Sequence, residues 1–213
     1  DYCRAAAEYI GEASTVGAHV SKAAQIRLSN GLASVTLADL RRRGLDLSLA
    51  VAGEREIGGG LRSVRADVSE MSMTDGLRLA VEIKPVHLAV GRAVWNRFGD
   101  VRTFAVNVHL KFPFAVVGGI LTLPTTERHR SGDDTSWKST SHLVSRAVGR
   151  FVRAGGRRTE GDAGHLLEAI AVVAFDRTTG AIEPDLPPVG CGLRGTEFID
   201  RMAETYDARF GDI

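Results

Sequence analysis

A glutamate and a lysine, Glu82 and Lys84, stand two positions apart at the end of an apolar segment. Residues 77–85 alternate in the way that is typical of a β-strand, and Pro85, which has no backbone N–H, is expected to end its pairing. The alternation predicts one face with Arg78, Ala80, Glu82 and Lys84, and an opposite face with Leu77, Leu79, Val81 and Ile83. The strand would therefore deliver a carboxylate and an ammonium group to the same side.

A third charged residue, Asp67, lies in the segment just before this strand. Residues 61–71 also have the composition of a strand, and the turn-forming residues 72–76 separate the two segments. The interval between Asp67 and Glu82 is short enough for one hairpin to span it. If the two strands pair in this way, Asp67 comes close to both Glu82 and Lys84.

Two carboxylates and an ammonium group in one place have a chemical meaning. Carboxylates a few Å apart repel each other, and a divalent cation relieves that repulsion. Carboxylates, a backbone carbonyl and waters are the ligands that Mg²⁺ prefers. A neighbouring lysine can position or help to deprotonate a water and can neutralise developing negative charge. Together these groups are suited to phosphodiester hydrolysis.

The same pattern has a simpler explanation, because an acid two positions before a lysine is common on the solvent face of a strand. Three observations favour a site. The segment that leads to Lys84 is too apolar for a free surface strand. Asp67 is on the neighbouring candidate strand. The chain also has 23 Arg and only 4 Lys, and arginine, which stays protonated, cannot do the acid–base chemistry of lysine.

Asp67, followed by Glu82-Ile83-Lys84 at the end of an apolar strand, resembles the signature of the PD-(D/E)XK nuclease superfamily, and the chain is most similar to a type II restriction endonuclease. The resemblance covers roughly residues 62–175 as an order of elements: a strand with the aspartate, a strand with E-x-K, a helical stretch, a strand, a helix and a strand. Ala66 stands where the family name has proline, at a position that varies widely in the superfamily.

We therefore expect an α/β fold with a mixed central β-sheet flanked by helices, like that of restriction endonucleases. A single nuclease domain would span residues 1–213, with an N-terminal helical part at 1–50, a catalytic core at about 52–176 and a C-terminal helix at about 196–210. The resemblance implies double-stranded DNA as substrate, a homodimer as the cutting unit, and a cognate DNA methyltransferase in the same system.

The resemblance also implies roles for the site residues. Asp67, Glu82 and the carbonyl of Ile83 would hold Mg²⁺, for which Mn²⁺ can substitute, and Lys84 would position or activate the attacking water. Further acids that are candidates for the metal site are Glu8, Glu12, Glu54 and Glu56. Two other hypotheses stay open: a repair, recombination or modification-dependent nuclease with the same site, and a DNA-binding or scaffold protein that has the fold without activity.

Polar side chains beyond the strand are candidates for DNA contacts, although solvated positions explain them about as well. They are Arg92, Asn96, Arg97 and Lys111, the polar loop at residues 125–135, and the arginines between residues 146 and 158. His87 lies three positions past Lys84 and is either near the scissile bond or structural.

The composition is that of an ordinary globular protein, with 44% hydrophobic and 25% charged residues. A net charge of +1 means that a DNA-binding face would need its arginines gathered locally. Cys3 and Cys191 form no C-x-x-C motif, which argues against a zinc site or a disulfide framework and favours a cytoplasmic setting. We expect no signal peptide, and we expect no membrane span because no apolar run reaches roughly 18–20 residues. It opens on Asp1 rather than Met, so its natural start is left open.

The remaining pattern predicts the elements around the site. Helices are expected at residues 3–28 and 36–43, separated by a stop signal at Ser29-Asn30-Gly31, and a glycine-rich turn at 52–60. Residues 86–112 are expected to form two helices broken near Gly99-Asp100, which caps the second. A central strand at 114–123 contains Gly118-Gly119, which indicates a bulge or a close backbone approach. A helix at 136–152, a strand at 166–175 and a helix at 196–210 follow.

Overall fold

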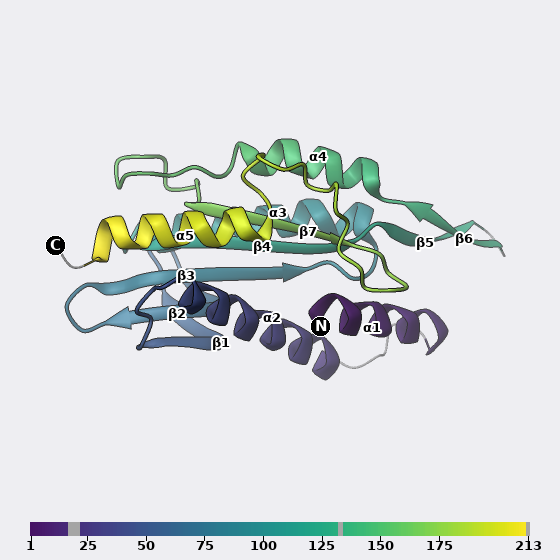
Figure 1. The fold of residues 1–213 in the computed structure, drawn as a ribbon, viewed down its shortest axis with the longest axis horizontal. Coiled ribbons are helices and arrows are strands. Elements are labelled where there is room, and N and C mark those ends of the chain that lie inside the picture. The colour runs from purple at the N-terminus through teal and green to yellow at the C-terminus, as the bar shows by residue number, and fades with distance from the viewer. Residues whose placement is uncertain (17–21, 132–133, 212–213) are drawn as a thin grey trace.

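The computed structural model describes residues 1–16, 22–131 and 134–211. At its centre lies a five-stranded sheet in the order β1-β2-β3-β4-β7 (Figure 1). The strands are β1 (Ala50–Gly58), β2 (Ser63–Ser72), β3 (Gly76–Pro85), β4 (Val116–Pro124) and β7 (Ala169–Phe175). The pairs β1–β2 and β2–β3 are antiparallel, whereas β3–β4 and β4–β7 are parallel. The expected α/β fold with a mixed central sheet flanked by helices is confirmed.

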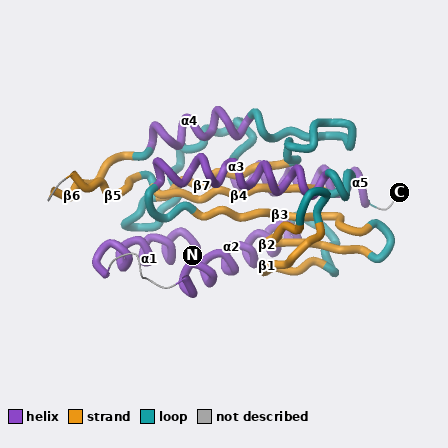
Figure 2. Tube along the Cα trace, turned by 180° about the vertical axis from the view of Figure 1, so that it is seen from behind, coloured by secondary structure: helices purple, strands orange, loops and turns teal. Residues whose placement is uncertain are grey.

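Helices cover both faces of the sheet and create two apolar cores. On one face α2 (Lys22–Arg42) and α5 (Gly195–Phe210) bury Leu37 and Phe198 against the strands, in what we call the α2/α5 core. On the other face α3 (Val90–His109) and α4 (Ser141–Val152) bury Phe104 and Phe151, in the α3/α4 core. The view from behind shows α3 lying along the sheet (Figure 2). The first helix, α1 (Tyr2–Val16), packs beside α2 (Figure 1).

The parallel pairing of β3 and β4 follows from the helix between them, because parallel neighbours need a crossover connection. Two glycines at the centre of β4 let the helices on both faces come close. A Cβ on Gly118 would lie 2.8 Å from Phe198 of α5, and one on Gly119 would lie 2.6 Å from Val101 of α3. The close backbone approach expected at Gly118-Gly119 is therefore confirmed.

The β2–β3 hairpin has the expected turn but not the expected regular alternation. Its register pairs Val68 with Val81, and it shifts between Glu70 and Met71. As a result Leu77 lies in the α3/α4 core, whereas Leu79, Val81 and Ile83 lie in the α2/α5 core. The prediction that all four apolar residues share one face was wrong at Leu77, because a bulge changes which face the following residues occupy.

The expected boundary at Ser29-Asn30-Gly31 was wrong. Helix α2 continues through these three residues to Arg42, and residues 17–21 of the helix predicted at 3–28 lie outside the described part of the chain. The cost of one helical glycine is about 1 kcal/mol. Burial of Leu32, Leu37 and Leu40 in the α2/α5 core outweighs it.

Four other expectations near the site also need correction. Residues 52–60 are not a turn, because most of them belong to β1, where Gly53 has a φ of 119° next to a shift in register. Residues 86–112 contain one helix, α3, which runs through Gly99 and Asp100.

The expected loop at 125–135 contains β5 (Thr126–Ser131) and β6 (Asp134–Ser139), which pair as a two-stranded ribbon. The helix expected from residue 136 begins at Ser141. The strand and the helix predicted near the C-terminal end are confirmed as β7 and α5.

None of the described helices is both long enough and apolar enough to cross a lipid bilayer.

Candidate active site

Asp67 and Glu82 lie on neighbouring antiparallel strands, β2 and β3. The register of the hairpin pairs Val68 with Val81, so the next position along the antiparallel strands places Asp67 opposite Glu82. The Asp67 carboxylate bonds directly to the partner strand, because its Oδ2 accepts a hydrogen bond of 2.6 Å from the backbone N–H of Ile83. Asp67 is thereby held against the backbone that joins Glu82 to Lys84.

Glu82 and Lys84 form an ion pair across the intervening Ile83, with Lys84 Nζ against Glu82 Oε1. The Glu82 side chain is 8% exposed, whereas the Lys84 side chain is 25% exposed. The Glu82 carboxylate is therefore almost fully shielded from water, whereas the Lys84 ammonium group still contacts water. Both project near the C-terminal end of β3, where Pro85 closes the strand.

Burial destabilises the charged form of both carboxylates. It raises the pKa of Glu82 to about 7, although the charge and hydrogen bond of Lys84 act in the opposite direction. It also raises the pKa of Asp67, against the opposing effects of the Ile83 N–H and the Lys84 charge. One ammonium group thus does not fully compensate the buried Glu82 and the half-buried Asp67. A second cation at this place would lower both pKa values.

The site opens into a hollow of about 370 Å³ at the C-terminal end of β3. Asp67, Ile83 and Lys84 form part of its wall. The rest of the wall comes from α2, from β1, from the segment after β3 and from α3, and consists of Gln25, Ile26, Ser29, Asn30, Glu54, Pro85, Val86, His87, Leu88, Ala93 and Arg97. A ligand in this hollow would meet the carboxylate of Asp67 and the ammonium group of Lys84 together.

The four residues predicted to contact DNA are not gathered in one place. Arg97 lines the hollow, and its Nη1 lies 2.8 Å from Asp100 Oδ2 on the next turn of α3. Arg92 and Asn96 are exposed on α3 but do not line the hollow. Lys111 follows the far end of this 20-residue helix, about 30 Å along its axis, and its Nζ lies over the ring of Phe112. Only Arg97 is placed with Asp67 and Lys84.

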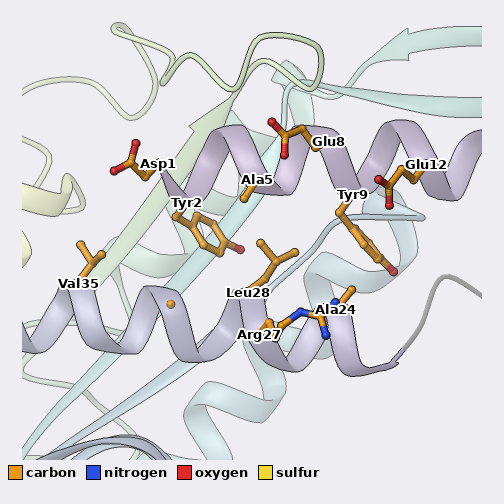
Figure 3. Close-up of a pocket in the computed structure, with 11 residues that line it drawn as sticks. Asp1, Tyr2, Ala5, Glu8, Tyr9, Glu12, Ala24, Arg27, Leu28 and Val35 are labelled. Atoms are coloured by element: carbon orange, nitrogen blue, oxygen red, sulfur yellow. The ribbon is translucent and has the colours of Figure 1, made fainter.

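Of the four additional acids, one lies beside the site. Glu54 of β1 lines the hollow and pairs with Arg65 at 3.2 Å, while Glu56 is exposed and does not line it. Glu8 and Glu12 border a different hollow of about 480 Å³ between α1 and α2, shown in Figure 3. That second hollow contains none of the Asp67, Glu82 and Lys84 set.

The oxygen atoms available at the site, from Asp67, Glu82 and the Ile83 carbonyl, suit a metal ion that needs few ligands from the protein. Among the described residues, no group of three or more His, Cys, Asp or Glu side chains is placed to hold a metal ion. Two acids and the Ile83 carbonyl remain, and Mg²⁺ is commonly bound through one or two carboxylates together with waters and substrate phosphates. The raised pKa values of Glu82 and Asp67 agree with this, because their charge is incompletely compensated by the protein.

The arginine-rich stretch predicted as a DNA-binding candidate divides into different environments. Arg157 is 1% exposed and pairs with the buried Glu168, so it is not available to a partner. Arg146 and Arg150 lie over the ring of Trp95, at 5.6 and 4.2 Å from its centre. The stretch is therefore not one basic surface.

Sequence reasoning missed the contribution of the N-terminal helices to the site. Gln25 and Asn30 of α2 line the hollow, and Tyr2 of α1 bonds through its hydroxyl to His87 in the same wall. No local signal marks these residues, because they reach the site only through the packing of α1 and α2 against the sheet. The stop signal at Ser29-Asn30-Gly31 instead predicted that the helix ends here, which gave no reason to expect this segment at the site.

Comparison of the chain with protein-family models, with curated proteins and with solved structures finds no match.

Proposed function

We propose that the chain is a divalent-metal-dependent endonuclease that hydrolyses phosphodiester bonds of double-stranded DNA, in the manner of a type II restriction enzyme. The observation that carries the proposal is the convergence of the buried Glu82 carboxylate, the half-buried Asp67 carboxylate and one ammonium group at the C-terminal end of β3. The order of the sheet, an antiparallel β2–β3 hairpin followed by parallel β4 and β7, supports a restriction-endonuclease-like fold.

Each residue has a role in the proposed reaction. Asp67, Glu82 and the Ile83 carbonyl would hold Mg²⁺ or Mn²⁺, which supplies Lewis-acid chemistry at the phosphate. Lys84 would hold the attacking water and offset the negative charge that develops on the phosphoryl oxygens. Attack by the water oxygen forms one P–O bond while the bond to the leaving oxygen breaks; the water releases one proton and the leaving oxygen takes one up, so the protons balance. Direct attack of this kind inverts the configuration at phosphorus.

The resemblance to restriction endonucleases adds a homodimer to the proposal, in which two sites related by two-fold symmetry would each cut one strand of the duplex. A cognate methyltransferase belongs to it only if cleavage is specific for a sequence. A repair, recombination or modification-dependent nuclease would use the same residues on a different target.

One observation favours a second candidate, a DNA-binding or scaffold protein without activity. Lys84 pairs directly with Glu82, so these two charges compensate each other in part without a metal. Such a protein should bind no Mg²⁺ at Asp67.

The test is incubation of plasmid and linear duplex DNA with Mg²⁺, Mn²⁺, Ca²⁺ or a chelator. The parent protein should cut with Mg²⁺ and Mn²⁺ only, and sequencing the ends should show one recurrent sequence if it is a restriction enzyme. Asp67→Asn is the matched control, because the amide oxygen can still accept from the Ile83 N–H while the charge is lost. It should abolish cutting. Duplex binding without any metal-dependent cutting would support the scaffold instead.

A further inference from the structure

A chain of three hydrogen-bonding side chains connects α1 to the wall of the candidate site. The hydroxyl of Tyr2 lies 2.9 Å from Thr122 Oγ1 of β4 and 3.1 Å from Nε2 of His87. Thr122 is fully buried, and His87 is 7% exposed in the segment between β3 and α3. The rings of Tyr2 and Tyr9 both lie beside the imidazole, with centres 6.4 and 5.2 Å from it. Figure 3 shows both tyrosines pointing from α1 toward α2.

The burial of Thr122 fixes the direction of these hydrogen bonds. Its hydroxyl has Tyr2 as its one side-chain partner within the described residues, so donating to the Tyr2 oxygen satisfies the Thr122 proton. Tyr2 then donates its own proton to Nε2 of His87. A nitrogen that accepts carries no proton in a neutral imidazole, so the ring proton is on Nδ1.

The protonation states agree with this assignment. Burial raises the pKa of Tyr2, so its hydroxyl keeps the proton that it donates. Burial lowers the pKa of His87 to about 4, so the ring carries a single proton at neutral pH. His87 is thus a hydrogen-bond donor of fixed tautomer rather than a cation.

The Nδ1–H group of His87 faces no acceptor within the described protein. His87 lines the same hollow as Asp67, Lys84 and Arg97, and Nδ1 has no hydrogen-bond partner among the residues that the structure describes. Nδ1 is not one of the fully buried polar atoms that lack a partner among the described residues, so it is reached from the solvent of the hollow and is free to donate to a ligand there. The ligand best suited to an N–H group beside an ammonium and a guanidinium group is an anion with several acceptor oxygens, such as a phosphate.

We propose that Tyr2, held by Thr122, fixes His87 so that its Nδ1–H donates to a phosphate oxygen of the DNA strand that enters the hollow beside Lys84. His87 is then a substrate-binding residue and Tyr2 is a positioning residue. This inference rests on the proposed function for the identity of the strand. The fixed tautomer and the binding of phosphate do not depend on cleavage.

The first test compares two substitutions of the ring. His87→Gln places an amide near the position of Nε2 and loses the donor at Nδ1, whereas His87→Asn places its amide N–H near Nδ1. In single-turnover cleavage with Mg²⁺, His87→Gln should be slower by roughly 10- to 100-fold, the scale of one hydrogen bond to a charged group. His87→Asn should lose clearly less. Equal rates for His87→Gln and the parent protein would overturn the proposal.

The second test examines Tyr2 with a matched control on the same helix. Tyr2→Phe removes the hydroxyl that sets the tautomer, and Tyr9→Phe removes a hydroxyl that bonds to Gln25 instead, at 2.6 Å. Long-range ¹H–¹⁵N spectra of the imidazole should show the Nδ1–H tautomer in the parent and in Tyr9→Phe, and a mixture in Tyr2→Phe. The Nε2–H tautomer in the parent protein would overturn the assignment.

The spectra also separate this inference from the proposed function. Inorganic phosphate should shift the Nδ1 signal of His87 in the parent protein but leave the ring of Tyr2→Phe much less affected. If the parent protein cuts no DNA but phosphate still shifts Nδ1, the nuclease proposal fails and the phosphate donor stands. If it cuts DNA while phosphate and the His87 substitutions have no effect, the nuclease proposal stands and this one fails.

Discussion

Two of the buried glutamates, Glu82 and Glu168, form ion pairs with basic side chains, and their charges are compensated to very different degrees. Glu168, just before β7, is enclosed by Arg157 and Arg209 at 3.0 and 2.9 Å, by His109 at 3.2 Å, and by the N–H of Val117 at 2.8 Å. Burial alone would raise the pKa of Glu168. The hydrogen bond and charge of His109, the charge of Arg209 and the Val117 N–H together bring that pKa below its ordinary value.

Glu82 is nearly as deeply buried but has one basic partner, Lys84. Its pKa is raised to about 7 by burial, and Asp67 and Asp100 add to the rise. Glu168 therefore has a complete set of partners and ties together segments that are distant in the sequence. The charge of Glu82 is incompletely compensated, and its ion-pair partner Lys84 lines the hollow, although Glu82 itself does not. A site that awaits a ligand is expected to show the second arrangement, because ligand binding then supplies the missing interaction.

The first prediction compares charge removal at the two glutamates. Glu168→Gln should destabilise the fold by roughly 3–5 kcal/mol, because Arg157 and Arg209 lose their buried counter-charge. Glu82→Gln should leave stability near neutral pH unchanged or slightly increased and should abolish Mg²⁺-dependent cutting. Urea unfolding of both variants at constant m-value measures the difference. Equal destabilisation of the two variants would show that Glu82 is also a structural residue.

The second prediction concerns Lys84, the ion-pair partner of Glu82. Lys84→Ala leaves Asp67 and the Ile83 carbonyl in place but removes the group that, in the proposed reaction, would hold the water and offset the developing charge. Cleavage should fall by about two orders of magnitude or more, while duplex affinity in Ca²⁺ changes little.

Lys84→Arg sharpens this test. It keeps the positive charge but is planar and does not deprotonate, so it should not restore full activity. A Lys84→Ala protein that cuts as fast as the parent would make Glu82 and Lys84 an ordinary ion pair at a strand end.

Much of the sheet could be predicted because its signals are local. The β2–β3 hairpin follows from two apolar segments around a turn, and the tight packing at Gly118-Gly119 follows from glycines inside a buried strand. These patterns predict the strands of the sheet and therefore predict that Asp67, Glu82 and Lys84 lie close together. In the structure all three lie near the C-terminal end of β3.

What could not be predicted depends on packing between distant segments. Arg157 and Arg158 are adjacent in the sequence, yet only Arg157 is buried, because its partner Glu168 lies on a different segment. The contact between Tyr2 and His87 could not be predicted for the same reason, because the two residues are 85 positions apart in the sequence. The glycine of the stop signal costs about 1 kcal/mol in a helix, which burial of a leucine exceeds, so α2 could pass through Ser29-Asn30-Gly31.

The last prediction uses pH, because the two glutamates should affect stability in opposite directions. Glu82 has a folded pKa of about 7, above the ordinary value of 4.5, so the folded protein holds its proton more tightly than the unfolded chain does. The stabilisation that this gives is complete below pH 4.5 and is lost as the pH rises through 7. For Glu168, with a lowered pKa, the stabilisation is present above pH 4.5 and is lost as the pH falls through the folded value.

In the presence of a chelator, the parent protein should therefore lose stability between pH 5 and pH 8 relative to Glu82→Gln, which has no proton to release at this position. A shift from 4.5 to about 7 corresponds to at most about 3 kcal/mol, and about 1–2 kcal/mol is expected after relaxation and hydration of the ionised form. Mg²⁺ should reverse the loss in the parent protein above pH 7, because it binds the ionised carboxylates, and should do less for Glu82→Gln. The measurement is the free energy of unfolding by urea across this pH range, with and without Mg²⁺. A parent protein whose stability parallels that of Glu82→Gln at every pH would mean that burial does not hold Glu82 protonated, and the contrast with Glu168 would then lose its basis.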